Sequence, residues 1–232
     1  MAANFLADDM AEYRVIAGSC KATPAHIMTS QAEKARTLIK YTGPGRVIWI
    51  ALGSNIPGTW GFPEVSILRA ICEIEKLPMH LVARSPLYST EPLGNVRQPR
   101  YLNMVIGVRG SLGPSTLLRA LKRLEAAAGR RRRVERGPRP LDLDILDHAG
   151  RIVGGSSARR IDGRLILPHP ELHKRGFVLV PLAAVAPTWR HPRLGVGVRQ
   201  LLARYPTLAR GIRRLRAPAD ARLRERPPSV SR

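Results

Sequence analysis

Apolar runs and apolar stripes alternate along the central part of the chain. Residues 47–52 (Val-Ile-Trp-Ile-Ala-Leu) are an uninterrupted apolar run next to glycine, which is typical of a strand buried on both faces. Pro63 is suited to the first turn of a helix, so a helix is predicted to begin there. Leu117, Leu121, Leu124 and Ala128 form one stripe at helical spacing, which predicts a helix over 115–128. Gly129 stands at the position where that helix would stop.

Three further segments have the composition of strands. Residues 80–85 and 87–89 are interpreted as one strand interrupted at Pro86, and residues 101–109 and 141–146 as two more. The resulting order is β-α-β-β-α-β, which predicts an α+β, ferredoxin-like fold: an antiparallel sheet with two helices on one face. Residues 177–185 are apolar and are expected to pack on this sheet as a C-terminal addition.

The flanks of this pattern have a different character. Residues 1–45 are weakly periodic and end in Thr-Gly-Pro-Gly, so we interpret them as an N-terminal extension, in part disordered. The domain is predicted to span 46–192. Residues 193–232 form a basic C-terminal tail, with one possible helix over 198–205 and disorder after it.

Composition narrows the choice of partners and compartment. The 232 residues carry a formal net charge of +22, but the last forty residues hold eleven arginines against two acidic residues. The charge therefore says little about the domain itself, and with 5% aromatics the chain lacks the alternation of aromatic and basic residues that stacks nucleic-acid bases. Two cysteines cannot build a disulfide framework, and no apolar run approaches the length of a membrane span. We expect a cytoplasmic protein that does not bind membranes, and binding of nucleic acid is not favoured.

Asp142 and Asp144 are the strongest candidates for chemistry. Strand spacing places both carboxylates on one face, while Leu141, Leu143 and Ile145 point to the other. Two adjacent carboxylates repel each other unless a cation lies between them, and such oxygen ligands suit Mg²⁺. The arginines at 130–133, 136 and 139 lie just upstream, which indicates a phosphorylated substrate, most simply a nucleotide.

Four separated segments match a known family in order and spacing. They are Ala-Leu-Gly-Ser-Asn (51–55); Tyr-Ser-Thr-Glu-Pro-Leu-Gly (88–94) with Gln-Pro-Arg-Tyr-Leu-Asn (98–103); Arg-Gly-Pro-Arg (136–139) with Leu-Asp-Leu-Asp-Ile-Leu (141–146); and Pro-His-Pro (168–170) with Arg-Gly-Phe (175–177). Over roughly residues 46–192 the chain resembles the 6-hydroxymethyl-7,8-dihydropterin pyrophosphokinase family of folate biosynthesis.

The resemblance implies transfer of diphosphate from ATP to the hydroxymethyl group of a reduced pterin, with release of AMP. It implies two Mg²⁺ ions on Asp142 and Asp144, which together with Arg130 and Arg139 would be the catalytic residues. Arginine suits phosphate because its fork donates two parallel hydrogen bonds and stays charged. The ATP-binding residues that the resemblance implies are Glu125, Arg130, Arg132, Arg136, Arg139, Ile145, His169 and Arg175.

The resemblance also implies a pterin site. Its residues would be Thr90, Leu93, Tyr101, Asn103 and Phe177. Flat rings from Tyr101 and Phe177 could sandwich a flat bicycle, and the Asn103 amide offers both a donor and an acceptor. We treat Gly-Ser-Asn (53–55) as a structural turn beneath the pterin, not as a catalytic group.

Some positions depart from the family pattern or allow other interpretations. A tryptophan is expected directly before Gly137, where this chain has Arg136, and Lys122 stands where glutamine is expected. His169 and His173 have the spacing of a helical zinc pair, but no third ligand is evident. The alternatives are a degenerate paralogue that binds pterin without turnover, and a basic nucleic-acid-binding module of the same fold. A monomer is expected.

Overall fold

The computed structural model describes residues 46–92, 97–131, 137–154 and 165–215. The expectations for 1–45 and 216–232 lie outside these residues. The strands are β1 (Ile48–Ser54), β2 (Met79–Arg84), β3 (Tyr88–Thr90), β4 (Tyr101–Gly110), β5 (Asp142–His148) and β6 (Arg213–Arg214). The helices are α3 (Pro63–Glu75), α4 (Pro114–Ala127), α5 (Gly176–Val185) and α6 (Val198–Arg204), with short 3-10 helices η2 (Leu172–Lys174) and η3 (Pro206–Ala209).

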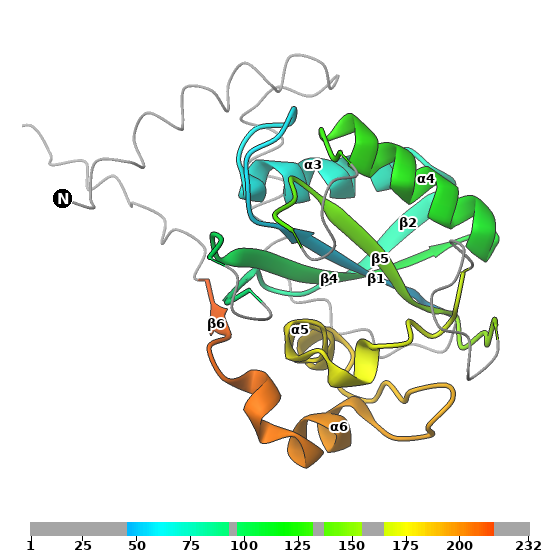
Figure 1. Ribbon diagram of the computed structural model, residues 1–232. Coiled ribbons are helices and arrows are strands. Elements are labelled where there is room, and N and C mark those ends of the chain that lie inside the picture. The colour runs from blue at the N-terminus through cyan, green and yellow to red at the C-terminus, as the bar shows by residue number, and fades with distance from the viewer. Residues whose placement is uncertain (1–45, 93–96, 132–136, 155–164, 216–232) are drawn as a thin grey trace, which may run out of the picture.

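The strands form a single antiparallel sheet with helices on both faces (Figure 1). Their order is β5-β1-β4-β3-β6, and β2 also pairs with β4. The apolar run that predicts a doubly buried strand is β1, which lies between β5 and β4. The predicted α+β architecture, with helices α3 and α4 together on one face, is confirmed (Figure 1).

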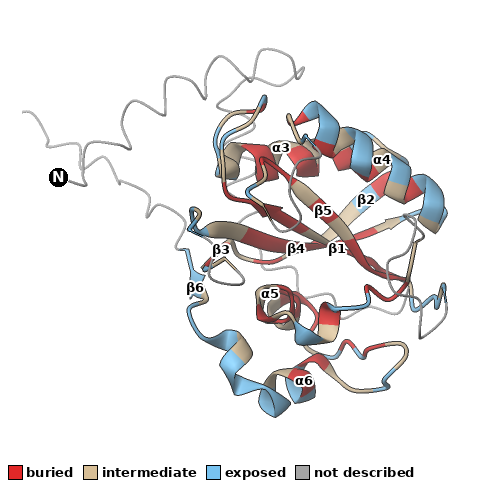
Figure 2. Ribbon diagram, in the orientation of Figure 1, coloured by how far each residue is buried: buried red, intermediate tan, exposed pale blue. Residues whose placement is uncertain are grey.

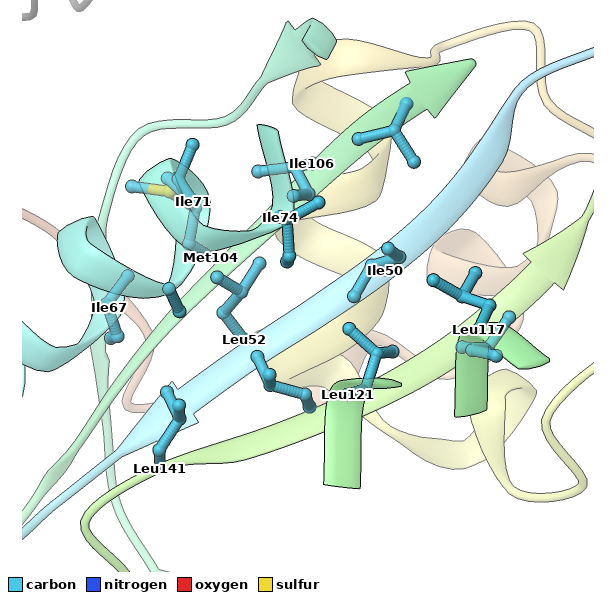
Figure 3. Close-up of a cluster of buried hydrophobic side chains, with 14 of the residues drawn as sticks. Ile50, Leu52, Ile67, Ile71, Ile74, Met104, Ile106, Leu117, Leu121 and Leu141 are labelled. Carbon is cyan, nitrogen blue, oxygen red and sulfur yellow. The ribbon is translucent and has the colours of Figure 1, made fainter. Parts of the chain in front are cut away.

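The face under α3 and α4 is a continuous apolar core. Ile50 and Leu52 of β1 meet Ile67 and Ile71 of α3 in one cluster of buried side chains (Figure 3). Leu117 and Leu121, the centre of the predicted stripe, are fully buried in the same cluster. Helix α4 is followed by Gly129 at a φ of +93°, a left-handed conformation that glycine adopts without strain.

The opposite face is covered by α5, and α6 packs on α5 (Figure 1). Trp49 and Leu146 of the sheet pack with Leu179 and Leu182 of α5 in a second apolar cluster. Residues 177–185 were expected to pack on the sheet, and this expectation is confirmed: they form most of α5.

The strand predicted over 80–89 is instead two strands. β2 pairs with β4 at residues 106–110, and β3 pairs with β4 at residues 101–103. Pro86 cannot donate a ladder hydrogen bond, which separates the two. Ser85 still bonds to Val105 through its backbone N–H (2.9 Å), so β2 and β3 follow the same edge of β4.

Residues 193–215, assigned from composition to a basic tail, are ordered up to Leu215 and pack against the rest of the chain. The helix predicted over 198–205 is α6, whose Val198 and Leu201 are buried beside α5. Disorder was predicted too early in the chain, because η3 and β6 follow α6 and β6 pairs with β3. No helix in the described ranges is long and apolar enough to cross a membrane.

Candidate active site

A cleft of about 360 Å³ opens on the α5 face of the sheet, at the end where β1 finishes and β4 and β5 begin. Sheet residues form its floor, and the segment that leads into α5 forms one wall. The lining residues are Gly53, Thr90, Glu91, Gln98, Tyr101, Asn103, Arg139, Asp142, Glu171, Lys174, Arg175 and Phe177.

Strand register brings the floor residues together. Gly53 of β1 lies opposite Asn103 on one side and Asp142 on the other. The Asn103 amide donates a hydrogen bond to the Thr90 hydroxyl at 2.8 Å, and both side chains are buried. A Cβ at Gly53 would lie 3.1 Å from Asn103 Oδ1, so glycine keeps this part of the floor open.

The turn after β1 holds the loops that flank the floor. Asn55 Oδ1 accepts the backbone N–H of Arg139 at 2.8 Å, and Asn55 Nδ2 donates to Gln98 Oε1 and to Pro99 O, both at 3.2 Å. The Ser54 hydroxyl donates to Pro140 O at 2.6 Å. Both side chains are engaged in backbone and loop contacts, in agreement with the structural role predicted for residues 53–55. Gly53 and Ser54, however, belong to β1, so the turn begins one or two residues later than predicted.

Two aromatic rings border the cleft. The Tyr101 hydroxyl donates to Gly137 O at 3.1 Å, and burial raises the pKa of Tyr101. Phe177 lies at the start of α5 with the Arg175 guanidinium 5.7 Å from its ring centre, a cation–π contact. The structure therefore places flat surfaces on the β4 and α5 sides of the cleft.

Asp142 is held between two arginines. Arg130 Nη1 contacts Asp142 Oδ1 at 2.5 Å, and Arg139 Nη1 contacts Oδ2 at 2.9 Å. Burial acts to raise the pKa of Asp142, but the charges of Arg130 and Arg139 outweigh it and hold the pKa below its usual value. The carboxylate is therefore ionised at neutral pH, with 23% of its side chain exposed to the cleft.

Glu125 connects helix α4 to this cluster. Its Oε1 accepts the backbone N–H of Leu143 at 2.7 Å and contacts Arg130 and Lys122 at the same distance. Burial raises the pKa of Glu125, although Lys122 and Arg130 act against that rise. Glu125 thus fixes β5 from one side and orients Arg130 toward Asp142 from the other.

Asp144 lies one strand repeat from Asp142 and is 18% exposed. Arg175 Nη1 is 3.8 Å and His169 Nε2 is 3.9 Å from Asp144 Oδ2. Arg175 also forms an ion pair with Glu171. Both predicted carboxylates therefore share one face, as the strand spacing predicted, and each lies beside at least one arginine.

His169 and His173 do not form a metal pair with a third ligand. No group of three metal-ligating side chains occurs within residues 46–215 as far as the structure describes them. His173 instead packs edge-on against His191, with ring centres 5.8 Å apart. Two carboxylates without a third protein ligand still suit Mg²⁺, which fills its other positions with water and phosphate oxygens.

The remaining predicted residues lie in different environments. Ile145 is 4% exposed and belongs to the α3/α4 core, so its side chain does not line the cleft. Leu93, Arg132 and Arg136 lie outside the described residues. Arg130, Asp144 and His169 are not among the lining residues, but direct contacts join them to Asp142, Arg175 and Glu171, which are. Glu125 reaches the cleft only through Arg130.

Four lining residues were not predicted: Glu91, Gln98, Glu171 and Lys174. Glu91 and Gln98 lie inside segments that carry the family resemblance, so their place in those segments could have identified them as residues of the cleft. Glu171 directly precedes η2 and Lys174 is its last residue, and neither carries a sequence pattern of its own. The ion pair from Glu171 to Arg175 is visible only in the fold.

Comparison with known proteins points to one family. Residues 49–187 match the model of the family described as 7,8-dihydro-6-hydroxymethylpterin-pyrophosphokinase (HPPK). A Pseudomonas aeruginosa protein named 2-amino-4-hydroxy-6-hydroxymethyldihydropteridine pyrophosphokinase is 41% identical over 169 residues, 72% of this chain and 96% of that protein. A Bacillus subtilis protein of the same name is 36% identical over 140 residues, 60% of this chain and 77% of that protein.

Among solved structures, the chain is similar to Plasmodium falciparum HPPK-DHPS, with a TM-score of 0.57 and 13% identity. The match covers 78% of this chain and 51% of that one, so the chain spans about half of the larger protein. At this identity the likeness shows a shared fold. Because the family model covers more than half of its residues, the chain belongs to the 7,8-dihydro-6-hydroxymethylpterin-pyrophosphokinase family.

Proposed function

We propose that this protein transfers the terminal diphosphate of ATP to the hydroxymethyl group of 6-hydroxymethyl-7,8-dihydropterin and releases AMP, as a step of folate biosynthesis. The observation that carries the proposal is that two features lie next to each other in one cleft. The ionised Asp142 carboxylate, which forms ion pairs with Arg130 and Arg139, lies beside a pocket bordered by Tyr101 and Phe177. The first feature suits phosphate and its cation, and the second suits a flat heterocycle.

The proposed pterin site uses polar groups for orientation. Thr90 and Asn103 already bond to each other, which fixes the Asn103 amide in one rotamer. The remaining amide positions can meet the polar edge of the pterin ring. Tyr101 and Phe177 would enclose its faces and exclude water from the hydroxymethyl group.

The proposed nucleotide site uses the arginines. Arg130 and Arg139 now donate to Asp142, and their other guanidinium N–H groups can donate to phosphate oxygens. Arg175 and His169 lie on the Asp144 side, where they can meet the rest of the polyphosphate. These side chains would position the phosphates and offset the charge that develops between the attacking hydroxyl and the leaving AMP.

Asp142 and Asp144 would hold Mg²⁺, for which their chemistry fits: both are partly exposed carboxylates on one strand face, and Asp142 lines the cleft. Bound Mg²⁺ supplies charge neutralisation of the phosphates, and two ions are proposed. No side chain of the described cleft is assigned as general base. A monomer located in the cytoplasm, where ATP is available, completes the proposal.

A single assay tests the proposal. The protein is incubated with Mg²⁺, ATP and 6-hydroxymethyl-7,8-dihydropterin, and AMP is followed with and without the pterin. We expect AMP formation that depends on the pterin. Binding of pterin without AMP would instead identify a degenerate paralogue, and the absence of both would reject the assigned site.

A further inference from the structure

Residues 206–215, here called the C-terminal brace, comprise η3, β6 and the turn between them. The brace lies beyond residues 49–187, the part that the family model matches. It contacts both walls of the cleft, although none of its residues lines the cleft.

The first contact is with the wall carried by β3. Arg213 pairs with Ser89 and Arg214 with Tyr88 in the antiparallel sheet. The backbone N–H of Leu215 donates to Leu87 O at 2.8 Å. β3 ends at Thr90, so the brace extends the sheet beside the strand that supplies this lining residue.

Arg100 strengthens this contact. Its guanidinium donates to the Ser89 hydroxyl at 2.9 Å, to Glu91 Oε1 at 2.7 Å and to Gly211 O at 2.7 Å. One planar side chain therefore joins the end of β3 to the turn of the brace. Glu91 lines the cleft, so the orientation of its carboxylate depends on this link.

The second contact is with the wall carried by α5. A Cβ at Gly176 would lie 1.7 Å from Leu208 O, so the backbone of η3 rests directly on the first residue of α5. Gly176 stands between Arg175 and Phe177, both of which line the cleft. Leu208 and Phe177 pack against the same apolar cluster.

We propose that the C-terminal brace is a positioning element that fixes the separation of the β3 wall and the α5 wall, and thereby sets the affinity of the cleft for the pterin. Arg100 and Leu208 are its positioning residues. The inference rests on the proposed function, because it takes the pterin as the ligand between these walls. Without the brace, each wall would keep its own fold, but the distance between the walls would no longer be fixed. Part of the free energy of pterin binding would then be used to order the two walls.

The test uses the full chain and a double-mutant cycle. Arg100→Ala releases the brace from the β3 wall, Leu208→Ala weakens its packing on the α5 wall, and the double variant does both. Arg210→Ala is the matched control, since it removes one positive charge from the brace outside these contacts. Calorimetry measures the pterin Kd in the presence of α,β-methylene-ATP, which cannot release AMP, together with the Kd of that analogue. Thermal unfolding of each variant monitors the fold.

Each single variant is expected to raise the pterin Kd about tenfold, with the nucleotide Kd changed less than about twofold. The pterin Kd of the double variant should be close to that of either single variant, because release of one end already frees the brace.

The proposal would be overturned if the single variants had the same pterin Kd as Arg210→Ala. It would also be overturned if the two increases in Kd multiplied in the double variant. If Leu208→Ala does not fold, the comparison of the pterin Kd of Arg100→Ala with that of Arg210→Ala decides whether the brace acts on the cleft. A parent chain that binds no pterin would reject the proposed function, whereas a parent that binds with unaffected variants would reject the brace alone.

Discussion

The two faces of the sheet are built from alternate residues of the same strands, and the central strand β1 is mostly buried (Figure 2). The two faces differ in the size of their side chains. On β1, the α3/α4 face has Ile48, Ile50 and Leu52, all large and buried. On the α5 face, the residues in order toward the cleft are Trp49, Ala51 and Gly53, and their side-chain volume decreases at each step.

β5 shows the same division. Leu143 and Ile145 complete the α3/α4 core, while Asp142 and Asp144 face α5. Decreasing side-chain volume on one face thus opens a cleft without removing any apolar residue from the other. This arrangement predicts that stability and chemistry can be changed separately by substitution at neighbouring positions.

The largest effect is expected at the carboxylates of the α5 face. Asp142→Ala and Asp144→Ala should each lower the rate of AMP formation about 10³-fold, because each removes a proposed cation ligand. The free energy of unfolding, measured by chemical denaturation, should change by less than about 1 kcal/mol, since both side chains are partly exposed. A rate loss below tenfold would contradict the metal role.

A core substitution on the α3/α4 face should have the opposite profile. Leu121→Ala leaves a cavity under the sheet and should lower the free energy of unfolding by about 3 kcal/mol. The kcat/KM per folded molecule should stay close to that of the parent at a temperature where both are folded. A loss of kcat/KM in the folded variant would show that the two faces are coupled.

Gly53→Ala tests the size gradient directly. The new methyl would lie 3.1 Å from Asn103 Oδ1, so the Asn103 amide must shift or the floor must rise. We expect the pterin KM to increase about tenfold with a smaller change in kcat, because a displaced binding group mainly affects binding. Ala51→Gly, farther from the cleft on the same face, is the control. Equal effects of the two changes would argue against the gradient.

The smallest effect concerns pH. Burial, with smaller contributions from His173 and Arg193, lowers the pKa of His191 to about 4, and its Nδ1 accepts backbone N–H groups of Arg193 and Leu194. The unfolded state therefore takes up a proton near the ordinary pKa of about 6.5, before the folded state does, so stability falls as pH drops from about 6.5 to about 4.

His191→Asn keeps an acceptor but cannot titrate in this range. The loss of unfolding free energy between pH 7 and pH 5 should be smaller in this variant than in the parent by about 1 kcal/mol. Denaturant titrations at both pH values measure the difference. An identical pH dependence in the two proteins would place the titration elsewhere.

Local pattern was sufficient for the elements whose signal is periodic. The run at 47–52, the stripe from Leu117 to Leu121 and the alternation of Asp142 with Leu143 each reflect burial that a strand or helix imposes on its own residues. Residues 53–55 were predicted to have a structural role, and the Ser54 and Asn55 side chains do hold the loops, although Ser54 is the last residue of β1 and not part of a turn.

The parts that were not predicted depend on distant partners. The interruption at Pro86 was predicted, but the sequence does not show that β2 and β3 pair with different parts of the same strand, β4. The arginines of β6 resemble a solvated tail until their backbone is seen beside β3. Lys174 lines the cleft because it lies in η2; the prolines at 168 and 170 signal a turn there, but not that Lys174 faces the cleft.

β6 has a further consequence for how molecules meet one another. A sheet edge with unpaired N–H and C=O groups can recruit a strand from another copy. Here β3 is covered along its outer side by a strand of two residues, and both are exposed arginines. A strand so short and so positively charged is a poor template for a second, equally charged copy. Beside β3, the sheet can therefore end in solvent without inviting edge-to-edge aggregation.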